Sequence, residues 1–358
     1  MRKTIKPGQP WLDTNGKRIQ AHGGSVICVD HKFYWYGENK EKTTGTDALW
    51  HWGVRCYSSD DLCDWKDEGV IIPPNPDDPT SPLHPNSMMD RPHIIYNEKT
   101  KKYVAWLKIM NDPSGFAVLT ADHILGPYEM VDPHVNPCGQ LVGDFDLCVD
   151  AKTGKGYVIS EKPHTAVYCA DLNEEYTDAQ SGYSEHFQHE APPLSREAPA
   201  HFIRNGKHYL ITSGTTGYFS NPSEAAVADD WHGPYRVLGN PHPSDTSKTS
   251  FNSQISSVFK HPYKKDLYIA VADRWRPEIP ELAGENYLNG KYSDQIQEKF
   301  RRIFDPKIEF VFTEEDAKDM RINSSMSDYV WLPLRFEGEN VIIDWVDEWS
   351  VDDYEEEK

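Results

Sequence analysis

Five strand-like runs of one kind recur along this chain of 358 residues, and they constrain its fold more than any other feature. Each run follows a tract of turn-forming residues, mixes aromatic with β-branched or aliphatic residues, and contains a tyrosine. The tyrosines are spaced by about 50 to 70 residues. The runs are KFYWYGE (32–38), KYVAWLK (102–108), KGYVISE (155–161), KHYLITS (207–213) and DLYIAVADRW (266–275).

A second strand-like element follows several of these runs and ends in an acidic, aromatic turn. Its examples are VRCYSSDDLCDW, AVLTADHILGPY and AAVADDWHGPY. Hairpins repeated at this period are typical of a β-propeller, in which each blade is a sheet of four strands. The 43 aromatic residues, with 23 Gly and 26 Pro, also suit short strands joined by tight turns. The five repeats therefore predict an all-β fold, a single five-bladed β-propeller over residues 1–358.

The repeat is interrupted once, by a polar stretch at about residues 276–328. Within it, residues 293–304 have a helical composition that opens on a Ser-Asp capping signal. Strand-like sequence resumes at DYVWLPLRF and VIIDWVDEW, which should complete the ring. We therefore expect a partly helical insertion in the last blade, and a frayed acidic tail at residues 351–358.

The charge and the cysteines bear on partners and location. A net charge of −20 disfavours binding to nucleic acid and to anionic membranes. No stretch approaches the roughly 20 apolar residues of a membrane-spanning helix. No apolar leader is visible after the first residues, and the six cysteines show no spacing typical of zinc. A cytoplasmic protein without nucleic-acid or membrane partners is expected.

Five polar residues, one in each repeat, stand just before or inside an apolar run that would form an inner strand. A propeller gathers its function at the axis, so side chains at these positions should converge there. The five are His22, Asp90, Asp144, Glu197 and Gln254.

Glu197 is the strongest candidate for acid chemistry. Cleavage of a glycosidic bond needs a carboxylic acid to protonate the leaving oxygen, and a second group that activates water or attacks. The SREAPAHF context of Glu197 suits a carboxyl half-withdrawn from water, although an ion pair with Arg196 is the plainer interpretation. Asp144 could orient that acid, or it could belong to a solvated acidic turn.

The other positions carry open alternatives. Asp90 and Arg91 could clamp sugar hydroxyls or form a structural salt bridge beside Pro92. His22, in IQAHGG, could line the axis, although a lone histidine is more often structural.

Together these residues resemble glycoside hydrolase family 43, and within it the branch of exo-β-1,3-galactanases. The resemblance runs from Trp11 to Trp349 outside the insertion. Its longest matching stretches are DRPHIIYNEKTKKYVAW, GDFDLCVD, REAPAHFIRNGKHYLITSGTTGY and SFNSQ. It implies a five-bladed propeller that hydrolyses an oligosaccharide or polysaccharide from its end.

The resemblance also implies roles for individual residues. Glu197 falls on the general acid of the family, and Asp144 falls near the carboxylate that tunes it. The aspartate that most members use as base is absent from IQAHGG, and Gln254 matches the glutamine thought to replace it in this branch, with inversion as the outcome. Pocket-lining positions follow at Asp90, His22, Glu38, Thr215, Asn252 and Trp275.

Two departures from the branch concern the substrate. Asp90 stands where a glutamate is usual, which moves the carboxylate by about 1.5 Å. Tyr218 stands where tryptophan is common. The resemblance implies no required cofactor, although some members hold a calcium ion or a water in the central channel. The sequence itself shows no metal motif and does not indicate an oligomeric state.

Three functions follow as hypotheses. The first is an exo-acting hydrolase that releases a terminal galactose-like sugar from a β-1,3-linked chain. The second is an arabinofuranosidase or galactofuranosidase on the same scaffold. The third is a carbohydrate-binding propeller without catalysis, which the missing carboxylate base favours.

Overall fold

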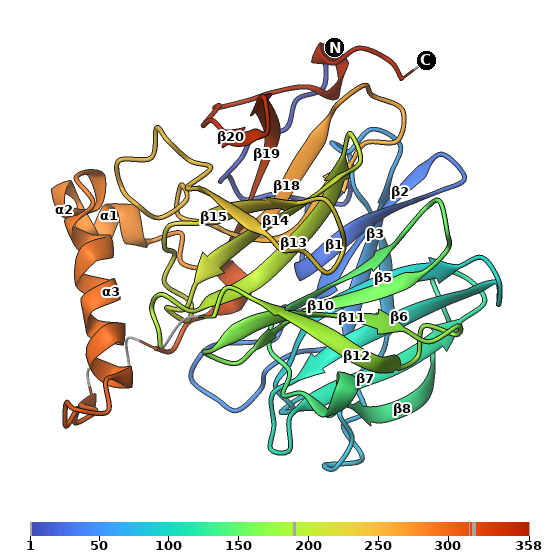
Figure 1. The fold of residues 1–358 in the computed structure, drawn as a ribbon, viewed down its shortest axis with the longest axis horizontal. Helices are drawn as coiled ribbons and strands as arrows, with labels where there is room; N and C mark the ends of the chain where they lie inside the picture. The colour runs from blue at the N-terminus through green and yellow to red at the C-terminus, as the bar shows by residue number, and fades with distance from the viewer. Residues whose placement is uncertain (1, 189–190, 315, 317–319, 358) are drawn as a thin grey trace.

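The protein is a five-bladed β-propeller, as the sequence predicts (Figure 1). The computed structural model describes all residues except 1, 189–190, 315, 317–319 and 358. The described strands form five antiparallel sheets of four strands, and each sheet uses four strands that are consecutive in the chain. The five innermost strands pack against one another in a ring, which the contact between β1 and β17 closes. These innermost strands are β1 (His22–Val29), β5 (Met89–Asn97), β9 (Phe145–Val149), β13 (Arg196–Arg204) and β17 (Gln254–Lys260).

The five repeated runs of the sequence are the second strands of the blades, next to the axis strands and buried on both faces. They are β2 (Lys32–Glu38), β6 (Lys102–Ile109), β10 (Gly156–Lys162), β14 (Lys207–Gly214) and β18 (Tyr268–Arg274). The third strands are β3 (Val54–Ser59), β7 (Gly115–Ala121), β11 (Ala166–Leu172), β15 (Glu224–Ala228) and β19 (Asp328–Glu337).

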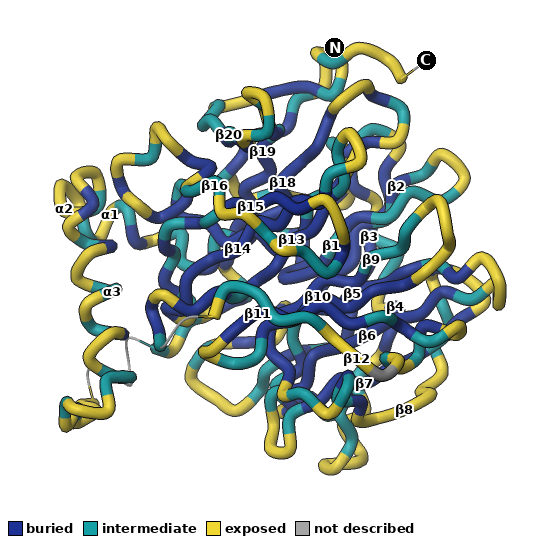
Figure 2. Tube along the Cα trace, viewed as in Figure 1, coloured by how far each residue is buried: buried dark blue, intermediate teal, exposed yellow. Residues whose placement is uncertain are grey.

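The outermost strands complete the blades at the rim. They are β4 (Lys66–Ile72), β8 (Glu129–Val135), β12 (Ala179–His186), β16 (Arg236–Gly239) and β20 (Asn340–Ile343). Burial falls from the axis to this rim, and β8 is exposed over most of its length (Figure 2). The described part also has three short 3-10 turns: η1 (Pro137–Gly139) between the second and third blades, η2 (Ser324–Met326) before β19 within the last blade, and η3 (Val351–Asp353) after β20.

The ring closes without an exchanged strand, because the last blade is built entirely from β17 to β20. The N-terminal segment strengthens this junction: the amide of Ile5 donates to the carbonyl of Trp349 at 2.8 Å. An aromatic cluster packs behind it, centred on the fully buried Trp35 of β2. The Trp35 ring lies 4.6 Å from that of Tyr329 and 4.7 Å from that of Trp331, both on β19. Apolar packing thus joins the first blade to the last.

The predicted insertion lies between β18 and β19, in the last blade, and its residues 315 and 317–319 are outside the described part. Its helices are α1 (Ile279–Ala283), α2 (Glu285–Leu288) and α3 (Lys291–Phe304), which stand at one side of the propeller (Figure 1). The Ser-Asp capping signal was misread, because α3 begins at Lys291 after Gly290. Ser293 lies inside the helix and donates to the carbonyl of Lys248 at 2.7 Å.

Helix α3 packs against the third and fourth blades. Phe300 packs on Phe219 in the loop between β14 and β15, with ring centres 6.4 Å apart. Phe304 packs on His164 in the turn between β10 and β11, at 4.9 Å. The insertion therefore forms a wall beside the axis. None of the helices in the described ranges is both long and apolar enough to cross a membrane.

The acidic tail does not fray over its described part, contrary to the sequence prediction. Its backbone pairs with the turn between β17 and β18: the amide of Lys265 donates to Glu355, and the amide of Glu357 donates to Tyr263, both at 2.8 Å. Lys264 Nζ adds an ion pair to Glu356, at 2.5 Å. The negative charges of the tail thus lie against a lysine-rich turn, and the hydrogen bonds and the ion pair to this turn hold the tail in place. Residue 358 lies outside the described part.

We predict that Trp35→Ala lowers the free energy of unfolding by about 3–5 kcal/mol, because it leaves a cavity in the junction of the ring. Chemical denaturation followed by tryptophan fluorescence measures the change. The control Phe312→Ala, at a side chain that is 53% exposed, should change it by less than about 0.5 kcal/mol. A loss below about 1 kcal/mol for Trp35→Ala would show that the cluster does not support closure.

Candidate active site

The five polar residues selected from the sequence all lie at the start of an innermost strand. His22 and Gln254 are the first residues of β1 and β17, Asp90 and Glu197 are the second residues of β5 and β13, and Asp144 directly precedes β9. Each blade therefore contributes one residue at the same end of the axis.

A β-bulge follows the site residue in three of these strands. The pairing register jumps after His22, after Asp90 and after Glu197. In each case the next residue is left-handed, with φ of 62° at Gly23, 50° at Arg91 and 49° at Ala198. The bulged stretches read His-Gly-Gly, Asp-Arg-Pro and Glu-Ala-Pro. A bulge bends the strand and re-aims a side chain, and a proline without an N–H is tolerated there.

A second polar residue backs each of the five, on the adjacent second strand. It is the direct pairing partner at Glu38, Lys108, Ser213 and Asp273. At the fifth position the Glu161 amide donates to the Asp144 carbonyl at 2.7 Å. All five partners are buried. Of these, the sequence analysis had selected only Glu38. The signal for the others was that each repeated run, after its apolar stretch, reaches a polar residue at or near its end.

Glu197 is a half-buried carboxyl at the centre of this group. Burial, together with the negative charges of Asp144 and Glu161, raises the pKa of Glu197 well above its ordinary value. The plainer interpretation, an ion pair with Arg196, does not hold. Arg196 donates to the Thr212 hydroxyl at 2.9 Å instead, because neighbours on a strand face opposite ways.

Asp144 is the opposite case, a buried carboxylate that stays ionised. Its burial alone would raise its pKa, but Arg91 and Lys108 outweigh that effect and hold the pKa at about 2. Arg91 Nη2 lies 3.0 Å from one carboxylate oxygen and Lys108 Nζ lies 2.6 Å from the other. Asp144 is therefore a fixed negative charge and not part of a solvated turn. Behind it, burial and the Asp144 charge raise the pKa of Glu161 to about 7.

Gln254 lies between Glu197 and Arg91. Its amide nitrogen donates to Glu197 Oε1 at 2.9 Å and to the Ser213 hydroxyl at 2.9 Å. Its amide oxygen accepts from Arg91 Nη2 and, at 3.1 Å, from Trp275 Nε1. Gln254 and Glu197, two of the five residues expected to converge at the axis, are thus in direct contact, whereas the role of Gln254 in place of a base stays a prediction.

Asp90 is a partly exposed carboxylate of the site. Trp50 Nε1 donates to it at 2.7 Å, and the ammonium groups of Lys108 and Lys40 lie 3.4 Å and 3.9 Å away. Asp90 and Arg91 do not clamp together, because Arg91 is buried and turns to Asp144. Asp90 is thus held toward the open side of the site by groups that it pairs with.

Lys40 was missed by the sequence analysis. It is 1% exposed, and its ammonium group contacts Glu38 at 2.7 Å and the carbonyl of Trp50 at 2.9 Å. Burial and the charge of nearby Asp90 raise the pKa of Glu38 to about 7, although Lys40 acts against the shift. No spacing in the sequence marks Lys40, because it lies in a loop after β2.

Three aromatic rings lie together beside the charged groups of the site. The Tyr218 ring is 5.3 Å from that of Trp275 and 6.5 Å from that of Trp50. Tyr218 and Trp50 are partly exposed, whereas Trp275 is 6% exposed. Aromatic faces of this kind suit the C–H faces of a sugar ring.

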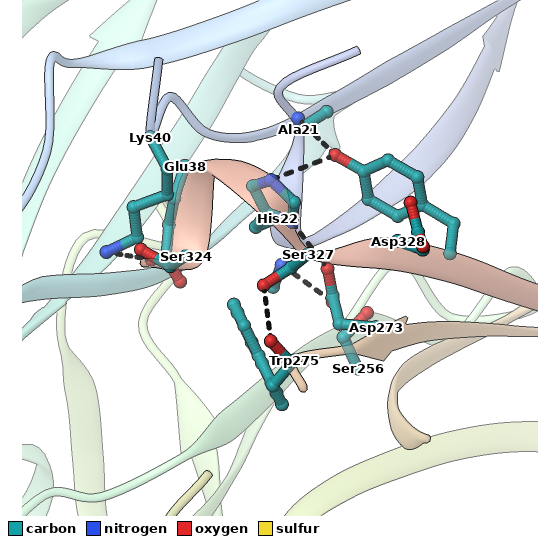
Figure 3. A network of polar contacts seen from close by, with 12 residues as sticks. Ala21, His22, Glu38, Lys40, Ser256, Asp273, Trp275, Ser324, Ser327 and Asp328 are labelled. Carbon is teal, nitrogen blue, oxygen red and sulfur yellow. Dashed lines mark hydrogen bonds and ion pairs between the residues drawn. The ribbon is translucent and has the colours of Figure 1, made fainter. Parts of the chain in front are cut away.

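Three of the predicted pocket residues are buried and bonded within the protein, so their contact with a sugar stays a prediction. His22 is fully buried between Asp273, 3.0 Å from Nδ1, and the Tyr329 hydroxyl, 3.3 Å from Nε2 (Figure 3). The Thr215 hydroxyl is 3.0 Å from both the hydroxyl and the carbonyl of Ser195. Asn252 donates to the carbonyl of Arg276 at 2.9 Å.

Glu38 is buried like these three, and its bonds to Lys40 and to the Arg91 amide turn it inward. Trp275 is held from behind: the Ser327 hydroxyl donates to its carbonyl at 2.8 Å (Figure 3). The six expected contacts therefore divide into Asp90 and Trp275 near the open side and four residues that support them.

The central channel below the site offers little to a cation. Among the described residues, His93 Nε2 is buried without a hydrogen-bond partner and lies 3.5 Å from a carboxylate oxygen of Asp146. Calcium prefers six to eight oxygen ligands. One imidazole nitrogen and one carboxylate do not fit such a site, and the described residues contain no group of three metal-ligating side chains. The axial ion stays a prediction, and the chemistry below does not use it.

The comparison with known proteins decides the family. The model of Glycosyl hydrolases family 43 matches residues 19–304, which include all five axial residues. The chain belongs to glycoside hydrolase family 43. The resemblance drawn from the sequence is thereby confirmed. No match was found among curated protein sequences.

Solved structures of family 43 members share the fold. The β-1,3-galactosidase BT3683, determined with galactodeoxynojirimycin, is 26% identical, with a TM-score of 0.76 over 97% of this chain and 100% of its own. The β-1,3-galactosidase BT0265 is 25% identical, with a TM-score of 0.75 over 99% of this chain, which spans 65% of its length. An exo-β-1,3-galactanase from Phanerochaete chrysosporium, determined with β-1,3-galactotriose, is 25% identical, with a TM-score of 0.75 over 98% and 68%.

We predict that Asp144→Asn lowers the pKa of Glu197. The substitution removes a nearby negative charge, and it leaves Arg91 and Lys108 free to stabilise the Glu197 carboxylate. Infrared difference spectroscopy against Glu197→Gln identifies the carboxyl band of Glu197 and follows its titration with pH. The control Asp132→Asn, at an exposed residue of β8, should leave the titration in place. An unchanged titration in Asp144→Asn would mean that the Asp144 charge does not contribute to this pKa.

Proposed function

We propose that this protein is an exo-acting glycoside hydrolase that releases terminal galactose from β-1,3-linked galactan or its oligosaccharides. One observation carries the proposal: Glu197 is a half-buried carboxyl with a pKa raised well above its ordinary value, and it lies near the ionised carboxylate of Asp144. That pairing is the one that a glycosidase needs to protonate a leaving oxygen at neutral pH. The sugar is inferred from the relatives, which are described as β-1,3-galactosidases and an exo-β-1,3-galactanase.

In the proposed reaction Glu197 gives its proton to the glycosidic oxygen as the bond from that oxygen to the anomeric carbon breaks. Water adds to the anomeric carbon from the opposite face and releases one proton to solvent water, so the anomeric configuration inverts. The released sugar gains the hydroxyl group, and the leaving sugar gains the hydrogen. Asp144 and Glu161 then favour return of a proton to Glu197, because their charges oppose its ionised form.

The open side of the site would bind the terminal sugar. Asp90 is anchored by Trp50 and Lys108, so its carboxylate can accept hydrogen bonds from sugar hydroxyls without a large loss of side-chain entropy. Trp50, Tyr218 and Trp275 would pack on the sugar faces. The wall formed by α3 packs on the loop between β14 and β15, which carries Tyr218, and this supports attack at a chain end and not within a chain.

We predict that the wild type releases galactose from β-1,3-galactobiose and β-1,3-galactotriose, and that Glu197→Gln lowers this rate by about 10²–10⁴-fold. Loss of the proton donor should matter much less for dinitrophenyl β-galactoside, whose leaving group needs little protonation. Glu129→Gln, at an exposed carboxylate of β8, is the matched control. Sugar release is measured by chromatography.

Other outcomes separate the alternatives. Hydrolysis of arabinofuranosides or galactofuranosides in place of β-1,3-galactosides would favour the second hypothesis. Binding of galacto-oligosaccharides without hydrolysis would leave a carbohydrate-binding propeller. A Glu197→Gln variant that keeps more than about a tenth of the wild-type rate on galactobiose would remove Glu197 as the acid.

We also predict that the first product formed from a β-1,3-linked substrate is α-galactose, as inversion requires. Proton NMR recorded within the first turnovers resolves the anomeric signals before mutarotation mixes them. Initial release of β-galactose would show that the reaction proceeds with retention and a covalent intermediate.

A further inference from the structure

We propose that Gln254 is a positioning residue that fixes the acidic proton of Glu197 on one carboxyl oxygen, and that it does not take the proton from the attacking water. This inference rests on the proposed function and differs from the role that the family resemblance implies for Gln254. It comes from the hydrogen bonds around the side chain.

The orientation of the amide is determined by its neighbours. Arg91 and the Trp275 indole can only donate hydrogen bonds, so the atom that faces both of them must be the amide oxygen. The nitrogen then faces Glu197 and Ser213, each at 2.9 Å. The reverse orientation would place the N–H groups of the amide against these two obligate N–H donors of the protein.

All four hydrogen-bonding positions of the amide are therefore used. The two lone pairs of the oxygen face a guanidinium cation and an indole N–H, and the two protons of the nitrogen face oxygens. An imidic tautomer would carry a proton on the amide oxygen, where Arg91 and Trp275 already donate. The Arg91 charge, which is itself held by Asp144, further lowers the affinity of that oxygen for a proton. This arrangement is unsuited to a group that must accept a proton from water.

The same bonds determine where the proton of Glu197 lies. Glu197 Oε1 accepts the amide N–H of Gln254, so in the protonated carboxyl Oε1 is the carbonyl oxygen. The acidic proton is thereby placed on Oε2, the oxygen left for the leaving group. Since Arg91 holds Gln254 from the other side, the position of the proton depends on the link from Asp144 through Arg91 and Gln254 to Glu197.

Gln254→Glu separates this role from that of a base. The introduced carboxylate can still accept from Arg91 and Trp275, but it turns an acceptor oxygen toward Glu197 Oε1 in place of the donating N–H. The two carboxyls then share one proton, which is drawn away from the leaving group. We expect hydrolysis of β-1,3-galactobiose to fall by about 100-fold or more, and that of dinitrophenyl β-galactoside to fall by less than about tenfold.

The opposite result would overturn the proposal. A carboxylate is a far stronger base than an amide, so a base at this position should hold or raise the rate on both substrates in Gln254→Glu. A loss of equal size on both substrates would likewise exclude a role specific to the acid. Gln254→Ala with added azide gives an independent check: accelerated formation of galactosyl azide from galactobiose would point to a missing base and against the positioning role.

An infrared measurement tests the contact without any sugar. The carboxyl band of Glu197, assigned as the band lost in Glu197→Gln, should shift in Gln254→Glu and stay in place in the Asp132→Asn control. An unshifted band overturns the proposal. A shifted band in a protein that hydrolyses no galactoside would leave the positioning role standing while the proposed function fails. Circular dichroism and the unfolding midpoint of each variant confirm that it is folded.

Discussion

The buried guanidinium of Arg91 is the interaction on which the rest of the site depends. It comes from the second blade and is 4% exposed. Its side chain pairs with Asp144 of the third blade and donates to Gln254 of the fifth, and its backbone amide donates to Glu38 of the first at 2.9 Å. Burial of a cation costs several kcal/mol unless partners surround it. Here the first, third and fifth blades provide the partners of Arg91, and the fourth blade keeps Glu197 within reach of the Arg91 charge, so all four have to be in register. The site is therefore assembled only when the ring closes.

The charges around Arg91 alternate, and this alternation explains why neighbouring carboxyls behave differently. Asp144 lies between Arg91 and Lys108 and stays ionised, with a pKa of about 2. Glu161 and Glu197 lie near Asp144. Burial and the negative charge of Asp144 together raise the pKa of each of these two carboxyls. Carboxyls of similar intrinsic acidity thus separate into one fixed anion and two groups with raised pKa, which is the separation that the proposed role of Glu197 requires.

Backbone geometry delivers these groups to the axis. In β1, β5 and β13 a left-handed residue follows the site residue and breaks the pairing register, which turns the site side chain relative to the strand. The left-handed backbone of Arg91 and of Ala198 costs conformational free energy, and the ladder of paired residues on either side of each bulge offsets that cost. Each bulge also places the site residue opposite a polar residue of the second strand, and those partners build the inner layer of hydrogen bonds.

The sequence by itself determined the number of blades, because each repeated run marks one buried second strand, and it located one axial residue in each blade, including Glu197 and Gln254. It also located the insertion. It did not separate residues that face the pocket from residues that support it: His22, Thr215 and Asn252 were expected to touch a sugar and are buried, whereas Lys40 was missed. Thr215, Asn252 and Lys40 lie in loops just outside the strands, where the two-residue alternation that predicts side-chain direction does not apply, and the bulge after His22 breaks that alternation in β1. The protonation of Glu197 and the saturated bonds of Gln254 were likewise decided only in three dimensions. Both arise from groups on different blades, distant in the chain, whose separations are set when the ring closes.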